Sequence, residues 1–218
     1  MKYGRVNFDY ALDMGSRTPD NDGYIYMVNW MKYHEVAQYE GGDGPAISGK
    51  EADNRYAPFE VLADIGAVPV FIGDVVAQSS PGEWDRMAIV RYATRKSFID
   101  MQSRKDFKEK HVHKEAGMLY TICQGCVPDG DQPAVERRRY VRFDLTATAG
   151  PTGSPSDTVM FDVEGTVLGD GRVWSRLAMT WTDDIGEVPV LERGSDRMVL
   201  VAEAQTDRIG KALGGLLT

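Results

Sequence analysis

The stretch YIYMVNWM at residues 24–31 decides the fold, because it is apolar on both of its alternating faces. A strand with this pattern is typical of the middle of a sheet that is covered on both sides. The turn signal TPDNDG at residues 18–23 precedes it, and the glycine-rich loop GGDGP at residues 41–45 follows it. Residues 1–23 are therefore expected to form a polar N-terminal extension.

Beyond the loop, the sequence predicts a helix in two parts. Ser48 and Glu51 have the spacing of a capping box, which marks a helix start. Pro58 would break one straight helix from there, so we expect a short turn at Ser48 and a second start near Tyr56. Gly66 is a suitable residue to end this helix.

The rest of this unit is a hairpin, a helix in two pieces and a strand. The predicted elements are a strand at 68–76, a turn at 79–82, a strand at 84–93, helices at 97–102 and 106–116 with Asp106 as an N-cap, and a strand at 118–123. The resulting order is that of a ferredoxin-like β-α-β-β-α-β repeat, predicted for residues 24–128. Its helices would cover one face of the sheet, so the other face needs a second such unit or another chain.

The second half of the chain predicts a shorter version of the same order. Its expected elements are strands at 139–148, 159–168, 172–182 and 198–204, a Gly/Pro/Ser loop at 150–156 and a terminal helix at 206–217. Four residues of the first hairpin recur in the second: Phe71, Trp84, Arg86 and Ala88 align with Phe161, Trp174, Arg176 and Ala178. We therefore predict an α+β fold in which a degenerate second repeat, residues 136–218, packs on or beside the first. One chain could carry two halves of a barrel.

Composition narrows the class of protein. The formal net charge of −8 and the pI of about 5.0 argue against nucleic-acid binding, which needs a basic surface. The first residues contain no apolar core of signal-peptide length, and no apolar run approaches the roughly 20 residues that span a bilayer. Two cysteines do not make a disulfide framework. We expect a soluble cytoplasmic protein that contacts neither nucleic acid nor membrane.

Several of these stretches resemble a known family. Residues 56–66, 71–76 and 84–90, and the helix from Asp106 to Ala116 with a His followed by a basic residue near its end, are similar to an uncharacterised family of small proteins. That family belongs to the dimeric α/β-barrel superfamily, and the resemblance covers residues 24–127. It implies a pocket between sheet and helices and a homodimer or higher homo-oligomer. The superfamily includes cofactor-independent monooxygenases, polyketide cyclases, isomerases and haem enzymes, so membership does not fix a reaction. The additional C-terminal half departs from the family pattern and puts the usual dimer in doubt.

The three histidines are the first candidates for chemistry. His34 ends the first strand, and His111 and His113 end the second helix, so the predicted topology can bring all three to one end of the domain. A neutral imidazole is a natural general base near pH 7. His113 also falls on the His-plus-basic position of the resembled family. The plain alternatives are a surface histidine at a strand end and histidines that the dipole favours at a helix C-terminus. Together the three could also supply an open zinc or iron site.

Arg91 and two tyrosines complete the candidate site. Arg91 alternates with Met87 and Ile89 in a buried-looking strand, where it needs either an acid or an anionic ligand as a partner. Tyr56 and Tyr92 could orient a phenolic or carbonyl oxygen, although such tyrosines are more often core residues with one end in water. The predicted catalytic residues are His34, His113, Arg91 and Tyr56. The predicted pocket residues are Asn29, Trp30, Tyr33, His111 and Tyr92.

These residues favour a small-molecule enzyme that needs no cofactor. It would use acid/base chemistry of the isomerase, cyclase or monooxygenase type on an apolar, oxygenated substrate, with His34 or His113 moving the proton. A ligand-binding or assembly module without catalysis is the main alternative, and a metal or haem protein is a third. The C-x-x-C at Cys123 and Cys126 ends a strand rather than starting a helix, so an ordinary strand end is favoured over a redox site.

Overall fold

In the computed structural model of this protein, residues 4–148 and 157–217 are described. The helices are α1 (Phe8–Ser16), α2 (Gly49–Tyr56), α3 (Phe59–Asp64), α4 (Arg95–Met101), α5 (Lys105–Gly117) and α6 (Ile209–Leu213), with a short 3-10 turn, η1 (Glu40–Gly42). The strands are β1 (Arg5–Val6), β2 (Ile25–Tyr33), β3 (Val68–Gln78), β4 (Arg86–Tyr92), β5 (Met118–Pro128), β6 (Tyr140–Thr146), β7 (Thr158–Gly169), β8 (Arg176–Thr182) and β9 (Arg197–Asp207). The loop predicted at 150–156 lies outside the described residues.

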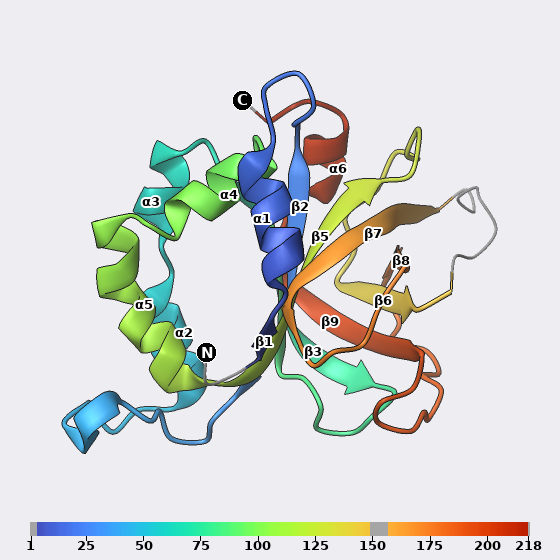
Figure 1. Cartoon of the computed structure of the whole chain (residues 1–218). Helices are drawn as coiled ribbons and strands as arrows, with labels where there is room; N and C mark the ends of the chain where they lie inside the picture. The colour runs from blue at the N-terminus through green and yellow to red at the C-terminus, as the bar shows by residue number, and fades with distance from the viewer. Residues whose placement is uncertain (1–3, 149–156, 218) are drawn as a thin grey trace.

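The strands form one closed antiparallel barrel (Figure 1). The order around it is β7-β5-β2-β4-β3-β9-β6-β8, and β8 pairs back onto β7. The short β1 pairs with the end of β7, beyond the stretch of β7 that pairs with β8. In Figure 1 the helices α1 to α5 cover one side of this barrel, while α6 lies at one end of it.

The predicted ferredoxin-like α+β fold is wrong: the structure is a closed eight-stranded barrel that is mostly sheet. The reason is edge pairing. Strand β9 hydrogen-bonds to the edge strand β3, and β7 hydrogen-bonds to the edge strand β5. The second half of the chain thereby continues the sheet of the first half instead of stacking on it. The apolar face of that sheet becomes the interior of the barrel.

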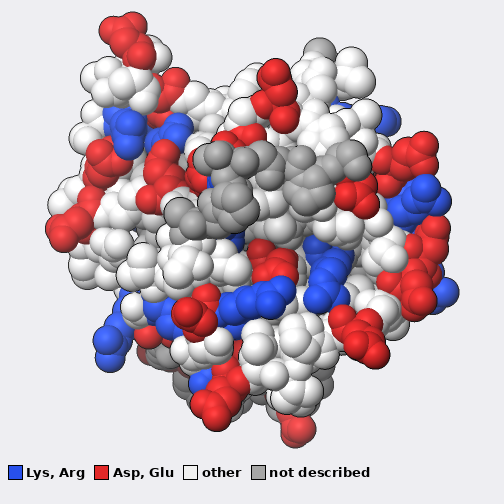
Figure 2. All heavy atoms as spheres, turned by 90° about the vertical axis from the view of Figure 1, so that its right-hand side faces the viewer, with Lys and Arg blue, Asp and Glu red and all other residues white. Residues whose placement is uncertain are grey.

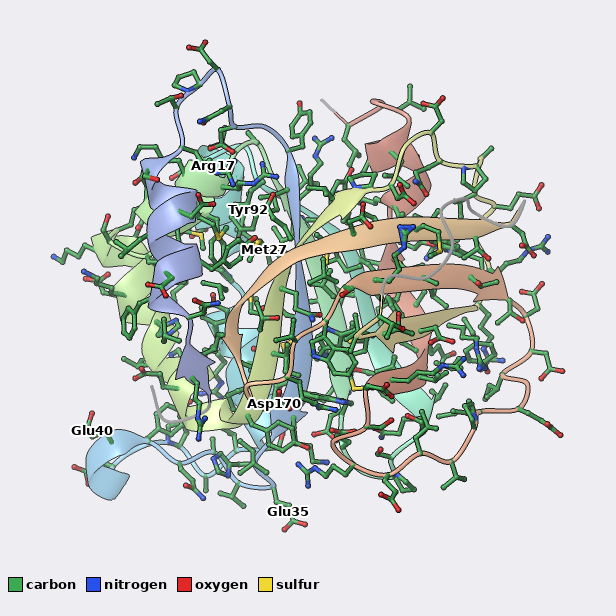
Figure 3. The ribbon with its side chains drawn as sticks, turned by 45° about the vertical axis from the view of Figure 1, so that its right-hand side comes forward. Arg17, Met27, Glu35, Glu40, Tyr92 and Asp170 are labelled. Atoms are coloured by element: carbon green, nitrogen blue, oxygen red, sulfur yellow. The ribbon has the colours of Figure 1, made fainter. Side chains whose placement is uncertain are left out.

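Strand β2 shows why the protein has two hydrophobic cores, one inside the barrel and one between the barrel and the helices. Tyr26, Val28 and Trp30 face the barrel interior, while Met27 and Met31 face the helices. The prediction of a strand buried on both faces is confirmed. Aromatic rings from both halves fill the barrel: Phe71 and Phe143 meet edge to face at 5.2 Å, and Trp30 and Phe143 at 6.2 Å. Figure 3 shows Met27 and Tyr92 in the second core, on the side of the strands next to α1.

The local signals were partly correct. Ser48 caps α2 as predicted, with its side chain accepting from the backbone N–H of Glu51, and Pro58 separates α2 from α3. Asp106 is not the N-cap of α5, because the helix already begins at Lys105, with Arg104 in the N-cap position. Asp106 instead forms an ion pair with Arg104. The supposedly polar extension contains α1, which is capped by Asn7.

The outer face of the second half carries no helix in the described part of the chain. Figure 2 shows Lys and Arg interspersed with Asp and Glu over this side of the barrel. Arg176 pairs with Asp162 at 2.8 Å and Arg197 pairs with Asp144. A face of this composition is stable in water without a cover. None of the described helices is long and apolar enough to cross a membrane.

Candidate functional site

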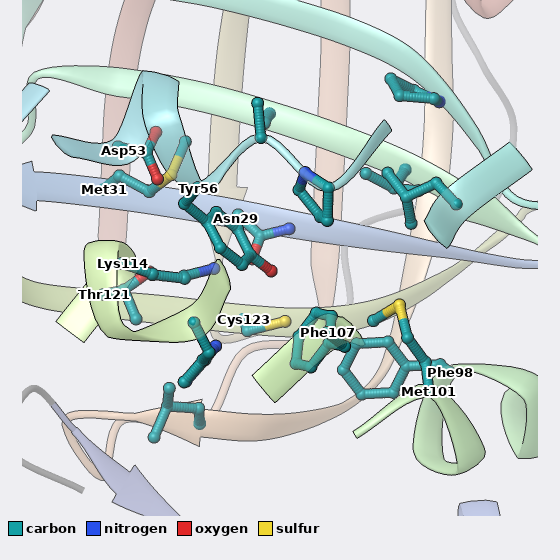
Figure 4. Close-up of a pocket in the computed structure, with 18 of the residues that line it drawn as sticks. Asn29, Met31, Asp53, Tyr56, Phe98, Met101, Phe107, Lys114, Thr121 and Cys123 are labelled. Atoms are coloured by element: carbon teal, nitrogen blue, oxygen red, sulfur yellow. The ribbon is translucent and has the colours of Figure 1, made fainter. Parts of the chain in front are cut away.

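A cavity of about 540 Å³ lies between the barrel and the helices α2 to α5 (Figure 4). Because alternate residues of β2 fill the barrel, Asn29 and Met31 face the helices and form part of the cavity floor. The floor residues contributed by β2, β4 and β5 are Asn29, Met31, Arg86, Ala88, Val90, Tyr92, Thr121 and Cys123. Most of this surface is apolar, as is usual in sites that bind small organic molecules.

Helix α5 supplies the opposite wall. Phe107, His111 and Lys114 follow one another at spacings of four and three residues, which places them on one helix face. Tyr56, at the end of α2, packs its ring 5.9 Å from Phe107 and 5.8 Å from His111, measured between centroids. The Nζ of Lys114 lies 5.0 Å from the centre of the Tyr56 ring. In Figure 4, Tyr56, Lys114 and Asn29 gather at one end of the cavity.

The other end of the cavity is apolar. Figure 4 shows Phe98, Met101 and Phe107 together there, with the sulfur of Cys123 pointing towards Phe107. Val167 and Leu168 of β7 add further aliphatic lining. A bound molecule would therefore place its apolar body against α4 and its polar group near Tyr56.

His111 also lies at this polar end, beside Tyr56. Burial, and then the nearby charge of Lys114, lowers the pKa of His111 to about 4. The imidazole is consequently neutral at pH 7 and can accept a proton. Its ring also stacks on Phe107, with centroids 5.3 Å apart, so its orientation is fixed by packing.

A polar network adjoins this end from α2. Asp53, Asn54 and Arg86 line the cavity. The hydroxyl of Tyr33 donates to Asp53 Oδ2 at 2.6 Å, and Arg86 donates to Asn54 Oδ1 at 2.8 Å and to Asp74 Oδ1 at 3.0 Å. Burial, and then the charge of Asp53, raises the pKa of Tyr33 far above its usual range, so its hydroxyl remains a donor. The arginine charge is thus balanced inside the protein, and this wall is rigid before any ligand arrives.

The cavity brings together part of the predicted site. The predicted residues that line it are Asn29, Tyr56, His111 and Tyr92. Tyr33 borders it through its hydrogen bond to Asp53. Trp30 faces the barrel interior, where its Nε1 donates to Gln124 Oε1 at 2.8 Å. Arg91 also lies on the interior side of β4, away from this cavity.

The other two histidines lie near the same end of the helices but do not line the cavity. The backbone N–H of His34 donates to the carbonyl of Gly117 at 2.9 Å, so His34 sits beside the end of α5. His113 Nδ1 is 2.8 Å from the hydroxyl of Tyr39, in the loop that precedes α2. All three histidines are within the described ranges, and among them His111 alone faces the cavity.

Sequence reasoning missed Lys114, Asp53, Asn54 and Arg86 as cavity residues. Lys114 had a usable signal, because it lies three residues after His111 and so shares the face of Phe107. Asp53 and Asn54 of α2 had no such signal in the sequence, because their exposure to the cavity depends on how α2 packs on α5.

The described residues contain no group of three or more His, Cys, Asp or Glu that could hold a metal ion. The C-x-x-C is also split by the strand. Cys123 belongs to the helix-facing core and Cys126 to the barrel interior, and both are buried, free thiols. Burial raises the pKa of Cys123 to about 11, so the thiol is unreactive at neutral pH.

Comparison with known proteins does not identify a family. No protein-family model matches the sequence, and no curated protein matches it significantly. Among solved structures, a protein of unknown function from Rhodopseudomonas palustris is 20% identical, over 57% of this chain and 95% of that one, with a TM-score of 0.47. A "putative monooxygenase" from Lactobacillus acidophilus NCFM is 10% identical, over 84% of this chain and 95% of that one, with a TM-score of 0.43. A "putative chlorite dismutase" is 11% identical, over 89% of this chain and all of that one, with a TM-score of 0.42.

Proposed function

We propose that the cavity beneath α5 is an acid/base site for an apolar small molecule that carries one acidic, oxygen-bearing group. The observation that carries the proposal is the neutral His111 beside Lys114 at the polar end of an otherwise apolar cavity. Isomerisation, cyclisation and oxygenation without a cofactor all begin by removing a proton from such a substrate. We assign this step to His111 rather than to His34 or His113, because His111 faces the cavity.

The proposed step moves one proton and one electron pair. The imidazole of His111 takes a proton from an acidic C–H or O–H bond of the substrate, and the electrons of that bond move onto the substrate oxygen. The ammonium of Lys114 and the side-chain amide of Asn29 lie at the same end of the cavity and would stabilise the oxyanion. Tyr56 holds Lys114 in place through its ring.

Lys114 also links the charge on the His111 imidazolium to the charge on the substrate oxyanion, because it lies close to both. In the free protein its charge disfavours the imidazolium form of His111. When an oxyanion forms beside Lys114, that repulsion is offset, so the imidazolium becomes more stable as the oxyanion develops. The base is thereby weak in the empty cavity and stronger when the substrate ionises. This behaviour limits proton uptake to productive complexes.

The test is exchange of an activated C–H bond in D2O. The probe is 2-tetralone, an apolar ketone with acidic hydrogens next to its carbonyl, followed by NMR in neutral buffer. We expect saturable, protein-dependent deuterium uptake, and its loss by at least about 100-fold in His111→Gln. Lys114→Gln should also slow exchange. His113→Gln is the matched control and should exchange at the wild-type rate.

A second pair of variants tests the location. Ala88→Phe places a ring on the cavity floor and should abolish exchange, whereas Ala178→Phe, at the aligned position on the uncovered side of the barrel, should not. Wild-type exchange in Ala88→Phe would place the chemistry elsewhere. Binding of 2-tetralone to this cavity without any exchange would favour the alternative of a non-catalytic binding module.

A further inference from the structure

A second hollow, of about 1260 Å³, lies at the end of the barrel beside α6. It shares no described lining residue with the first cavity. Tyr24, just before β2, and Arg91, near the end of β4, contribute from the barrel. Most of the remaining wall comes from the segment between β5 and β6, from the end of β9, and from α6 with the residues that flank it. In Figure 1, α6 stands at this end of the barrel, next to the start of β2.

Arg91 is the buried charge of this hollow. Its side chain alternates with Met87 and Ile89 on the interior face of β4, and the residue is 5% exposed. Its Nη2 donates to the carbonyl of Leu217 at 3.2 Å, and its guanidinium lies 4.5 Å from the centre of the Tyr24 ring. Its Nε has no hydrogen-bond partner, and no carboxylate pairs with it, within residues 4–148 and 157–217. Burying the charge of an arginine without a counter-charge is unfavourable, unless an anion binds to the guanidinium.

Three further cations line the same hollow. Arg137, Arg208 and Lys211 are exposed, and none of them forms an ion pair with another described residue. Most other described Lys and Arg side chains do pair with a carboxylate. The lining also contains Asp131 and Asp207, but neither pairs with these cations, and Asp207 accepts from Trp181 Nε1 at 2.7 Å. A protein of net charge −8 therefore concentrates unpaired positive charge in one concave place.

We propose that this hollow binds the oxyanion of a small molecule, a carboxylate or a phosphate. Arg91 would bind two oxygens of the anion with its fork of donors, and Tyr24 stacks on the guanidinium and holds it flat. Arg208 and Lys211 at the rim would attract the ligand and share its charge. The site is independent of the proposed proton transfer in the first cavity.

The test uses three matched fluorescent ligands: 2-naphthoate, 2-naphthyl phosphate and the neutral 2-naphthylmethanol. Binding is measured by isothermal titration calorimetry on the full, untagged chain. We expect at least one anion to bind more tightly than the neutral alcohol, and to weaken at least about tenfold in Arg208→Gln/Lys211→Gln. Both substituted residues are exposed, so this variant should fold normally. Whether naphthoate or the phosphate binds better identifies the preferred oxyanion.

Two controls locate the effect. Arg5→Gln/Lys108→Gln removes one Arg and one Lys that are likewise exposed and without a described ion pair, and it should leave affinity unchanged. Ala88→Phe blocks the first cavity and should also leave affinity unchanged. Arg91→Lys keeps the charge but loses the fork, and should weaken binding with no change in the circular dichroism spectrum. Equal binding of the neutral alcohol, equal losses in both double variants, or loss of binding in Ala88→Phe would each overturn the proposal.

Discussion

The lowered pKa of His111 predicts an acid-sensitive step in the stability of this protein. In the unfolded chain a histidine titrates near pH 6.5, whereas in the folded protein burial and the charge of Lys114 lower the pKa of His111 to about 4. As the pH falls below the unfolded value, the unfolded chain takes up this proton first. The stability that the neutral His111 provides is therefore fully present above about pH 6.5 and is lost as the pH falls towards 4.

The size of this loss follows from the two pKa values. Between pH 7.5 and pH 5.0 the difference in proton uptake amounts to about 2 kcal/mol of unfolding free energy. His111 is partly exposed at the cavity, so screening by solvent reduces this to about 1 kcal/mol. His111→Gln removes the titrating group and should reduce the loss between the two pH values by that amount.

The assay is urea unfolding followed by tryptophan fluorescence at both pH values. Carboxylates elsewhere also respond to acid, but they are the same in both proteins, so the difference between wild type and variant isolates His111. Lys114→Gln should reduce the loss, because the second cause of the low pKa is gone. If His111→Gln lost as much stability as wild type between pH 7.5 and 5.0, the reasoning about burial would be refuted.

Two further predictions concern the helix-facing core. Gly165→Ala should lower the free energy of unfolding by about 1–3 kcal/mol, because the added Cβ would lie 2.9 Å from the ring of Tyr10 in α1. Gly23→Ala is the control: its Cβ would meet open space, so it should lower the free energy of unfolding by less than about 0.5 kcal/mol in the same assay. Cys123, whose pKa burial raises to about 11, should react with Ellman's reagent roughly 100-fold more slowly than free cysteine at pH 8. Unfolding in urea should make both thiols of the chain reactive. Fast labelling of Cys123 in the native protein would contradict this prediction and would show that the cavity opens.

The sequence was informative wherever one element alone determines the outcome. The two-sided burial of β2 and the cap at Ser48 depend on a few neighbouring residues, and both are correct. The alternation of β4 also placed Arg91 on the face of Met87 and Ile89, where the structure has it. The helix α1 was missed because Phe8 and Leu12 on its outer side are exposed, which leaves no clear apolar stripe.

The sequence was uninformative where distant elements meet. Closure of the barrel depends on the pairing of β3 with β9, which are more than a hundred residues apart in the chain. Backbone hydrogen bonds of this kind leave no pattern in side-chain type. The site had the same difficulty: His111 and His113 differ by two positions on one helix, and only the packing of α2 on α5 decides which of them meets the cavity.

The two halves of the barrel explain why a cavity forms on one side only. Arg86 stands opposite Asp74 in its strand pair, and Arg176 stands opposite Asp162 in the aligned pair, so both hairpins place an ion pair on the outer face. Ala88 and Ala178 follow at the next outward position, but helices cover Ala88 alone. The small alanine side chain leaves room for a ligand, but it forms an enclosed cavity only at Ala88, where helices cover the strand. The second half instead fills the barrel interior, and thereby covers within one chain the apolar face that would otherwise need a partner.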